Sequence, residues 1–239
     1  MNRNRNAYRG RNIELLFRNS IGDHPQVINT IKTTFGIQGK YRTGISSGIH
    51  AEKKDVTLEF ACGRNVDANV KSYGAMGYNQ LTRTSISNFC KEFNLSSEWL
   101  IPLFINKARN VRAKLFPRDE QQMAIGLFNS KTKEIVKWSL STKASREILV
   151  LFDNNQNIFR IYKMKDVLTH IGYDLTFTDK GNIAIGKCVI FQRKGGNGKH
   201  SEHIRKDDIK HPGNNVQLKL KIDNFISKMQ DHELTRYTV

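Results

Sequence analysis

Apolar and polar side chains alternate in KKDVTLEF, residues 53–60. Its two faces in an extended chain carry Val56, Leu58 and Phe60 on one side and Asp55, Thr57 and Glu59 on the other. This period of two residues predicts a β-strand with one buried face and one polar face.

A second strand is predicted a few residues later, in ANVKSYG at residues 68–74. Asn69 and Lys71 share one face of this strand, and Val70 lies on the other. The short connection CGRNVD between the two stretches predicts a β-hairpin or a pair of adjacent strands.

Pairing of these strands would gather a carboxylate, an amide oxygen and a lysine at one spot, because residues two or four apart share a face. Asp55, Glu59 and Asn69 offer the oxygen ligands that Mg²⁺ prefers. Lys71 can orient or deprotonate a water molecule, or offset charge on a phosphate. The combination indicates metal-assisted hydrolysis of a phosphodiester. The pattern is short, and a surface hairpin with Asp55 and Lys71 as solvated charges is the alternative.

The rest of the chain predicts an α/β (α+β) protein. Two helices are expected within residues 12–35, with Glu14 on the first, and helical patterns continue through residues 81–128. The later strands are expected in REILVLFD, NIFRIYKM, a pair within GNIAIGKCVIFQRKG, and VQLKLKIDNF, with MKDVLTHIGY as a short helix. A shift in composition near residue 140 suggests two parts, 1–140 and 141–239, with one continuous domain as the alternative.

The charge of the chain calls for an anionic partner. Its 39 Lys and Arg residues outnumber 22 Asp and Glu residues, which gives a formal net charge of +17, and the excess is present in every quarter of the sequence. A field spread over a whole fold suits duplex nucleic acid, and a generally basic or ribosomal protein is the alternative. No apolar run approaches a membrane span, so no membrane partner is expected.

The three cysteines, Cys62, Cys90 and Cys188, are an odd number at long spacings, so they predict neither a disulfide framework nor a paired metal site. The first twelve residues are basic and lack the apolar segment of a secretory signal. A cytoplasmic protein is therefore expected. Zinc held by the later histidines is disfavoured for want of a cysteine pair, and the segment at 195–200 departs twice from the P-loop template.

Three stretches carry a resemblance to a known family. They are DANVKSYGAMGYNQLTR at residues 67–83, GNIAIGKCVIFQRKGGNGK at 181–199 and VQLKLKID at 216–223. Together they resemble the monomeric type II restriction endonucleases of the PD-(D/E)XK superfamily, most closely the enzymes that cut GCGC and more distantly MspI. Two departures stand out: Lys54 replaces the usual Pro, and Asn69 replaces the usual Asp or Glu.

The resemblance implies a restriction-endonuclease-like fold, in which a mixed central sheet is flanked by helices and a β-rich C-terminal part reads DNA. It implies a catalytic set of Asp55, Asn69 and Lys71. A metal ion would be held by Asp55, Asn69 and the carbonyl of Val70, with Glu59 as a weaker ligand. The expected ion is Mg²⁺, for which Mn²⁺ can substitute. Glu14 is either an outer acid of this site or a solvated helix charge.

The same resemblance implies a set of DNA-binding residues: Tyr78, Asn79, Gln80, Gln192, Arg193, Lys194 and Lys199. Tyr78 would wedge into the base stack, with ordinary strand packing as the alternative. Asn79 and Gln80 would lie at the bases. The amide and guanidinium groups of the set suit a G·C-rich site, because they match the hydrogen-bonding edges of guanine and cytosine.

The implied function is a prokaryotic, cytoplasmic type II restriction endonuclease that hydrolyses double-stranded DNA at a short G/C palindrome, with GCGC borrowed entirely from the resemblance. A monomer on DNA is expected, with a weak dimer as the alternative. Two other functions stay open: a repair or structure-specific nuclease with the same metal chemistry, and a DNA-binding protein without catalysis.

Overall fold

A computed structural model describes residues 5–46, 54–74, 77–196, 201 and 203–239. Lys199, one of the predicted DNA-binding residues, lies outside this part of the chain. The chain divides into two compact units, each assembled from separated segments. Unit 1 contains residues 1–79, 140–171 and 226–239, and unit 2 contains residues 80–139 and 172–225.

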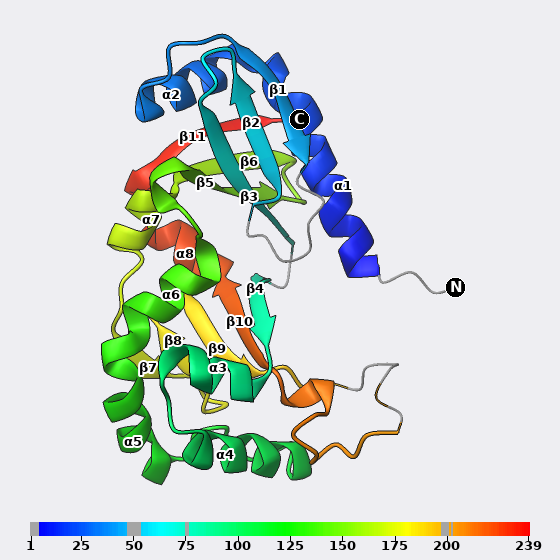
Figure 1. The fold of residues 1–239 in the computed structure, drawn as a ribbon, viewed down its shortest axis with the longest axis vertical. Helices are drawn as coiled ribbons and strands as arrows, with labels where there is room; N and C mark the ends of the chain where they lie inside the picture. Colours follow the sequence, from blue (N-terminus) through cyan, green and yellow to red (C-terminus); the bar gives the residue numbers. More distant parts are fainter. Residues whose placement is uncertain (1–4, 47–53, 75–76, 197–200, 202) are drawn as a thin grey trace. The chain divides into compact units, whose positions relative to one another are not determined.

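Unit 1 is built on a six-stranded mixed sheet with the strand order β1-β2-β3-β5-β6-β11 (Figure 1). The strands are β1 Tyr41–Ser46, β2 Val56–Phe60, β3 Asn65–Tyr73, β5 Glu147–Asp153, β6 Ile158–Lys163 and β11 Glu233–Thr238. The helices of this unit are α1 Arg5–Ser20, α2 Pro25–Phe35 and α7 Met164–His170. Neighbouring strands run antiparallel except β3 and β5, which are parallel.

The core of unit 1 explains why these segments form strands. The apolar residues of β2 and β3 pack with Phe17 of α1, with Ile21 directly after α1, and with Val27, Ile28 and Ile31 of α2. Strand β5 reads EILVLFD and is buried along its whole length, as expected for a strand covered on both faces. Its parallel partner β3 needs a crossover connection, and the chain supplies it by passing through unit 2 between residues 79 and 140.

Unit 2 is built on a five-stranded antiparallel sheet with the order β4-β10-β9-β8-β7 (Figure 1). The strands are β4 Tyr78–Thr84, β7 Leu175–Phe177, β8 Ile183–Ile185, β9 Val189–Arg193 and β10 Val216–Lys221. The helices are α3 Ile86–Phe93, α4 Ser97–Arg109, α5 Arg118–Phe128 and α6 Thr132–Leu140, and α8 Ile222–Lys228 crosses between the units.

An aromatic cluster forms the core of unit 2. The ring of Phe191 on β9 lies 5.1 Å from that of Phe89, 5.9 Å from Phe104, 6.1 Å from Phe116 and 5.2 Å from Phe128. All five side chains are fully buried. The helices α3, α4 and α5 therefore cover the face of the sheet to which Phe191 points, and Gln192 lies on its other face.

The expected fold class is confirmed: the protein is a mixed α/β protein with helices packed on a mixed sheet. The hairpin of β2 and β3, the helix α2 and the strand pair β8 and β9 lie where the sequence predicts them, whereas α1 begins at Arg5, before the predicted range of 12–35. The structure adds strand β1 before the hairpin. The predicted boundary near 140 falls at one of the four points where the chain crosses between units, and the division into domains 1–140 and 141–239 stays a prediction.

Two predicted elements are wrong at their ends. Residues 81–84, expected to begin a helical region, belong to β4, whose sequence YNQLTRT is rich in residues that favour strands and buries Leu81. Residues 222–225, expected to extend the last strand, begin α8, because Ile222 and Phe225 are buried three residues apart on one helix face. Elements α6, β7 and β11 were not predicted.

Within the described residues, no helix combines the length and the apolarity needed to cross a membrane.

Replacement of Phe191 by alanine tests the aromatic core. We expect Phe191→Ala to lower the free energy of unfolding of unit 2 by about 3–5 kcal/mol, because a buried ring is lost and a cavity remains. The measurement is urea denaturation followed by tryptophan fluorescence, since Trp99 and Trp138 both lie in unit 2. Val111→Ala, at a side chain that is 77% exposed, is the control. Equal stability of the two variants would contradict this packing.

Candidate active site

Asp55 lies immediately before β2, where the hairpin places it opposite β3. Its backbone N–H donates to the carbonyl of Ala68 at 2.9 Å, which continues the pairing of the two strands by one residue. Its carboxylate oxygen Oδ2 accepts from the backbone N–H of Val70 at 2.7 Å and from Nζ of Lys71 at 3.0 Å. The hairpin therefore brings the predicted acid and the predicted lysine into direct contact.

The ion pair between Asp55 and Lys71 is largely shielded from solvent, with side chains that are 19% and 16% exposed. Nζ of Lys71 also donates to the carbonyl oxygen of Val70 at 3.1 Å. The ammonium group is thus held between two oxygens that the sequence predicts as metal ligands. Such charge-assisted hydrogen bonds fix the direction of the lysine side chain.

Asn69 presents an oxygen atom that lacks a partner. The residue is buried, and its Nδ2 donates to the carbonyl of Leu140 at 3.0 Å. That acceptor assigns the orientation of the amide, because only the nitrogen can donate to a carbonyl. The opposite atom, Oδ1, is buried and has no hydrogen-bond partner. A buried oxygen without a partner is uncommon in folded proteins and is suited to a ligand.

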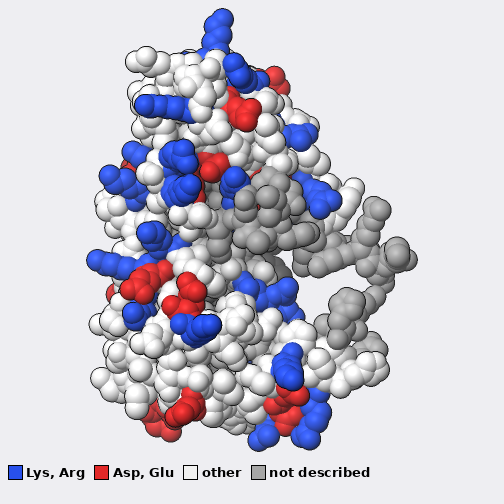
Figure 2. Space-filling model, in the orientation of Figure 1, with Lys and Arg blue, Asp and Glu red and all other residues white. Residues whose placement is uncertain are grey.

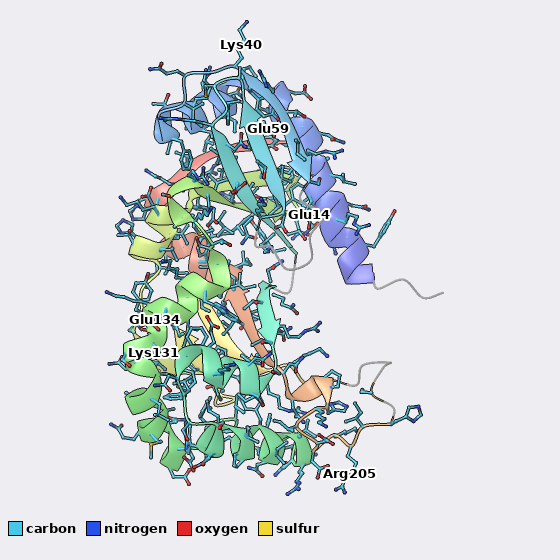
Figure 3. All side chains as sticks on the ribbon, in the orientation of Figure 1. Glu14, Lys40, Glu59, Lys131, Glu134 and Arg205 are labelled. Carbon is cyan, nitrogen blue, oxygen red and sulfur yellow. The ribbon has the colours of Figure 1, made fainter. Side chains whose placement is uncertain are left out.

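The charges of Asp55 and Lys71 affect the pKa of Glu14. Burial raises the pKa of Glu14, the negative charge of Asp55 raises it further, and the positive charges of Lys71 and Arg11 lower it in part. The residue reaches the site because α1 packs on β1 and β3. Figure 3 labels Glu14 on α1 beside the hairpin.

Glu59 shares the polar face of β2 with Asp55 but lies elsewhere along the strand. It pairs with Asn65 next to the turn, whereas Val56, the neighbour of Asp55, pairs with Ala68. Four residues of strand separate the two carboxylates by about 13 Å. The hairpin therefore does not bring Glu59 to Asp55. In Figure 3 the label of Glu59 lies nearer to Lys40 than the label of Glu14 does. Residues that share a face of a long strand need not share a site.

Among the described residues, no group of three or more His, Cys, Asp and Glu side chains could hold a metal ion. The oxygens at the hairpin are of mixed kinds: a carboxylate of Asp55, an amide of Asn69 and the backbone carbonyl of Val70. Hard divalent cations such as Mg²⁺ and Mn²⁺ accept all three kinds of oxygen. These residues consequently fit such an ion on the chemistry of their donor atoms and on the unpartnered Oδ1 of Asn69.

The predicted DNA-binding residues near the hairpin fall on β4. The Tyr78 side chain is 48% exposed. Nδ2 of Asn79 donates to the carbonyl of Ser72 at 2.7 Å, which ties the start of β4 to the end of β3. The amide nitrogen of Asn79 is therefore engaged by the fold. Gln80 is exposed, and in the division of the chain it is the first residue of unit 2.

Positive charges gather within unit 2 around the end of β9. Nε of Arg193 donates to Oδ1 of Asn214 at 2.7 Å. Burial lowers the pKa of Lys194, and the charges of Arg83 and Arg193 lower it further. Burial likewise lowers the pKa of Lys107, with Arg193 adding to the effect. Burial is the larger cause of both shifts, and the neighbouring positive charges add to it, which places several cations close together in a region that attracts anions. Figure 2 shows Lys and Arg spread over both units on the face in view.

Several members of this group escape sequence reasoning. Arg83, Lys107, Asn214 and Gln217 are far apart in the chain and were not predicted as site residues, although Arg83 and Gln217 lie within the stretches that resemble the known family. Gln217 alone carries a signal, because it is a glutamine within the alternating stretch VQLKLKID. Its 8% exposure shows that it is buried, unlike most polar residues on an outward strand face.

Comparison with known proteins finds a likeness among solved structures. No family model matches the chain, and no curated protein matches it. The chain is similar to a crystal structure of the restriction endonuclease MspI in complex with its cognate DNA, with 12% sequence identity and a TM-score of 0.46 over 82% of this chain and 77% of that chain. In the resemblance found from the sequence, MspI is the more distant of the two kinds of enzyme named. The closer resemblance, to enzymes that cut GCGC, stays a prediction.

The charges around Glu14 predict opposite responses to two substitutions. In metal-free protein, Asp55→Asn should lower the pKa of Glu14, because a negative neighbour is removed, and Lys71→Ala should raise it, because a positive neighbour is removed. The pKa should stay above its ordinary value in Asp55→Asn, since burial is the largest cause of the shift. Carboxyl ¹³C NMR titration measures both changes. Glu59→Gln is the control, and a Glu14 pKa that responds equally to all three variants would contradict the geometry.

Proposed function

We propose that the protein is a divalent-metal-dependent endonuclease that hydrolyses phosphodiester bonds in double-stranded DNA. The observation that carries the proposal is the cluster at the hairpin, where Asp55 and Lys71 are in contact and Oδ1 of Asn69 is buried without a partner. Taken with the sequence resemblance, this cluster favours a type II restriction endonuclease acting at a short G/C palindrome. GCGC is the first sequence to test.

The residues that would hold Mg²⁺ are Asp55, Asn69 and Val70, through a carboxylate, an amide and a backbone oxygen respectively. The chemistry that Mg²⁺ supplies in such a site is polarisation of the scissile phosphate and activation of a water molecule as nucleophile. Mn²⁺ can substitute, because it prefers similar oxygen ligands. Glu59 has no such place in the described contacts, since the register puts it next to the turn.

Lys71 would act on the reacting groups directly. Its ammonium is already aimed between the Asp55 carboxylate and the Val70 carbonyl. From there it can donate a hydrogen bond that orients the attacking water, or offset negative charge that grows on the phosphate in the transition state. Glu14, whose raised pKa reflects burial and Asp55, would hold a proton more readily than an ordinary carboxyl and so serve as the outer acid.

Unit 2 would supply most of the grip on DNA. Arg193 ends strand β9 and Lys194 follows it, and Arg83 and Lys107 add charge nearby. The net charge of +17 supplies a general attraction for phosphates. Gln80 and Gln192 add amide groups that can read base edges. A monomer on DNA is the simplest form, because each chain carries one such hairpin.

One observation favours a second candidate function. Asn69 carries no charge, so the hairpin offers Asp55 as the one carboxylate in direct contact with Lys71. A DNA-binding protein without catalysis would share the cation cluster of unit 2 and differ only in its response to metal. A repair nuclease would share the hairpin chemistry and lack a sequence preference.

Digestion of a plasmid that contains several GCGC sites separates these functions. We expect the wild-type protein with Mg²⁺ to give discrete fragments, and sequencing of their ends gives the site and the stagger. Lys71→Ala should cut at least about 100-fold more slowly, as expected for loss of a group that acts on the reacting atoms. Lys40→Ala, at an exposed lysine of unit 1 that Figure 3 labels away from Glu14, is the matched control.

Each alternative has its own outcome in this experiment. Smeared products would indicate a nuclease without a sequence code. Binding without cleavage in Mg²⁺ and in Mn²⁺ would indicate the non-catalytic protein. Unchanged cutting by Lys71→Ala would refute the assignment of the active site.

A further inference from the structure

Three glutamine amides lie in a row across unit 2, on the strands β9, β10 and β4. Nε2 of Gln192 donates to Oε1 of Gln217 at 3.1 Å, and Nε2 of Gln217 donates to Oε1 of Gln80 at 2.6 Å. Gln192 and Gln217 are directly opposite in the pairing of β9 with β10. The middle residue is buried, whereas Gln80 is exposed and Gln192 is partly so. We call these three residues the amide row.

The amide row has a direction. Gln217 uses its oxygen toward one neighbour and its nitrogen toward the other, so the two outer amides are turned in opposite senses. Gln80 is left with its NH₂ group to donate, and Gln192 is left with Oε1 to accept. Within the part of the chain that the structure describes, neither of these atoms has a hydrogen-bond partner. Reversal of the middle amide would exchange the donor and the acceptor ends together.

The surroundings of the amide row suit a nucleic acid. Arg193 and Lys194 follow Gln192 directly in the chain, and the pKa of Lys194 is lowered by Arg83 as well as by burial. The aromatic core around Phe191 packs on the opposite face of the sheet, so the row lies on the face that points away from this core. Cations beside an oriented donor and acceptor are the components of base reading with phosphate contacts.

We propose that Gln217 is a positioning residue for base recognition: it fixes Gln80 as a hydrogen-bond donor and Gln192 as an acceptor. This inference rests on the proposed function. In the major groove, guanine presents the acceptors O6 and N7, and cytosine presents the N4 donor. A donor at Gln80 and an acceptor at Gln192 match those edges in a G·C-rich site. An amide free to rotate would accept adenine or thymine edges as readily.

The test compares three 20-base-pair duplexes in the absence of divalent metal. One contains GCGC, one has a single G·C pair of that site replaced by A·T, and one contains no related sequence. Fluorescence anisotropy gives the dissociation constant of each. Gln217→Met keeps the length of the side chain and removes both hydrogen bonds of the middle amide. Gln122→Met, at an exposed glutamine on α5, is the matched control.

We expect the wild-type protein and Gln122→Met to prefer the intact site by about 10-fold or more. In Gln217→Met this preference should fall about tenfold, while binding to the unrelated duplex changes less than about twofold, because the cations are untouched. A second variant guards against misfolding. In Gln217→Glu the ionised carboxylate can only accept hydrogen bonds, so Gln80 must turn its NH₂ group toward residue 217 and present its oxygen to DNA. At the position read by Gln80, the preferred base should therefore change from one that presents a hydrogen-bond acceptor to one that presents a donor.

Three outcomes would overturn the inference. Undiminished discrimination by Gln217→Met shows that Gln217 does not position the readers, while the proposed function stands. An equal loss of binding to all three duplexes in both Gln217 variants shows a structural role only. Absence of any preference in the wild-type protein refutes sequence-specific binding at GCGC, and the inference fails with it.

Discussion

The site depends on one oxygen atom, Oδ2 of Asp55, which accepts from the backbone of Val70 and from the side chain of Lys71. The first bond joins Asp55 to the backbone of β3, and the second holds the ammonium group of Lys71. The register of the hairpin and the position of the lysine are therefore linked through one acceptor atom. A slip of one residue would turn Lys71 to the other face of β3 and leave Val70 in its place. The apolar faces of β2 and β3 oppose that slip, because it would expose the core.

The second constraint comes from the route of the chain. Strands β3 and β5 are parallel neighbours, so the chain must leave unit 1 and come back before β5 can pair. Leu140 lies in the returning segment, and its carbonyl accepts from Asn69. Glu147, at the start of β5, fixes the same segment by accepting from the backbone of Thr142 and Lys143. The orientation of the Asn69 amide, and so the direction of its Oδ1, is therefore fixed by a residue 71 positions later in the chain.

This explains what the sequence could and could not predict. Alternation in KKDVTLEF and ANVKSYG was sufficient for the hairpin and for the meeting of Asp55 with Lys71, because both follow from local periodicity. Periodicity also predicted correctly that Glu59 shares a face of β2 with Asp55. It could not predict that Glu59 lies away from Lys71, about four residues along the strand from Asp55, because the strand register decides which residues lie opposite each other. The hydrogen bond to Leu140 and the amide row through Gln217 are long-range contacts, and no local pattern encodes them. Strand β4 was missed because Leu81 is its one buried residue, so its sequence shows no alternation of apolar side chains, and its pairing with β10 is a long-range contact.

The chemistry proposed for the site requires that the hairpin oxygens bind a divalent cation. Paramagnetic line broadening by substoichiometric Mn²⁺ tests it most directly, with the side-chain amide of Asn69 and the backbone amides of Val70 and Lys71 as probes in ¹⁵N NMR spectra. These signals should broaden before any others in the wild-type protein and stay sharp in Asp55→Asn. Broadening centred elsewhere, or broadening at the hairpin that persists in Asp55→Asn, would contradict the account.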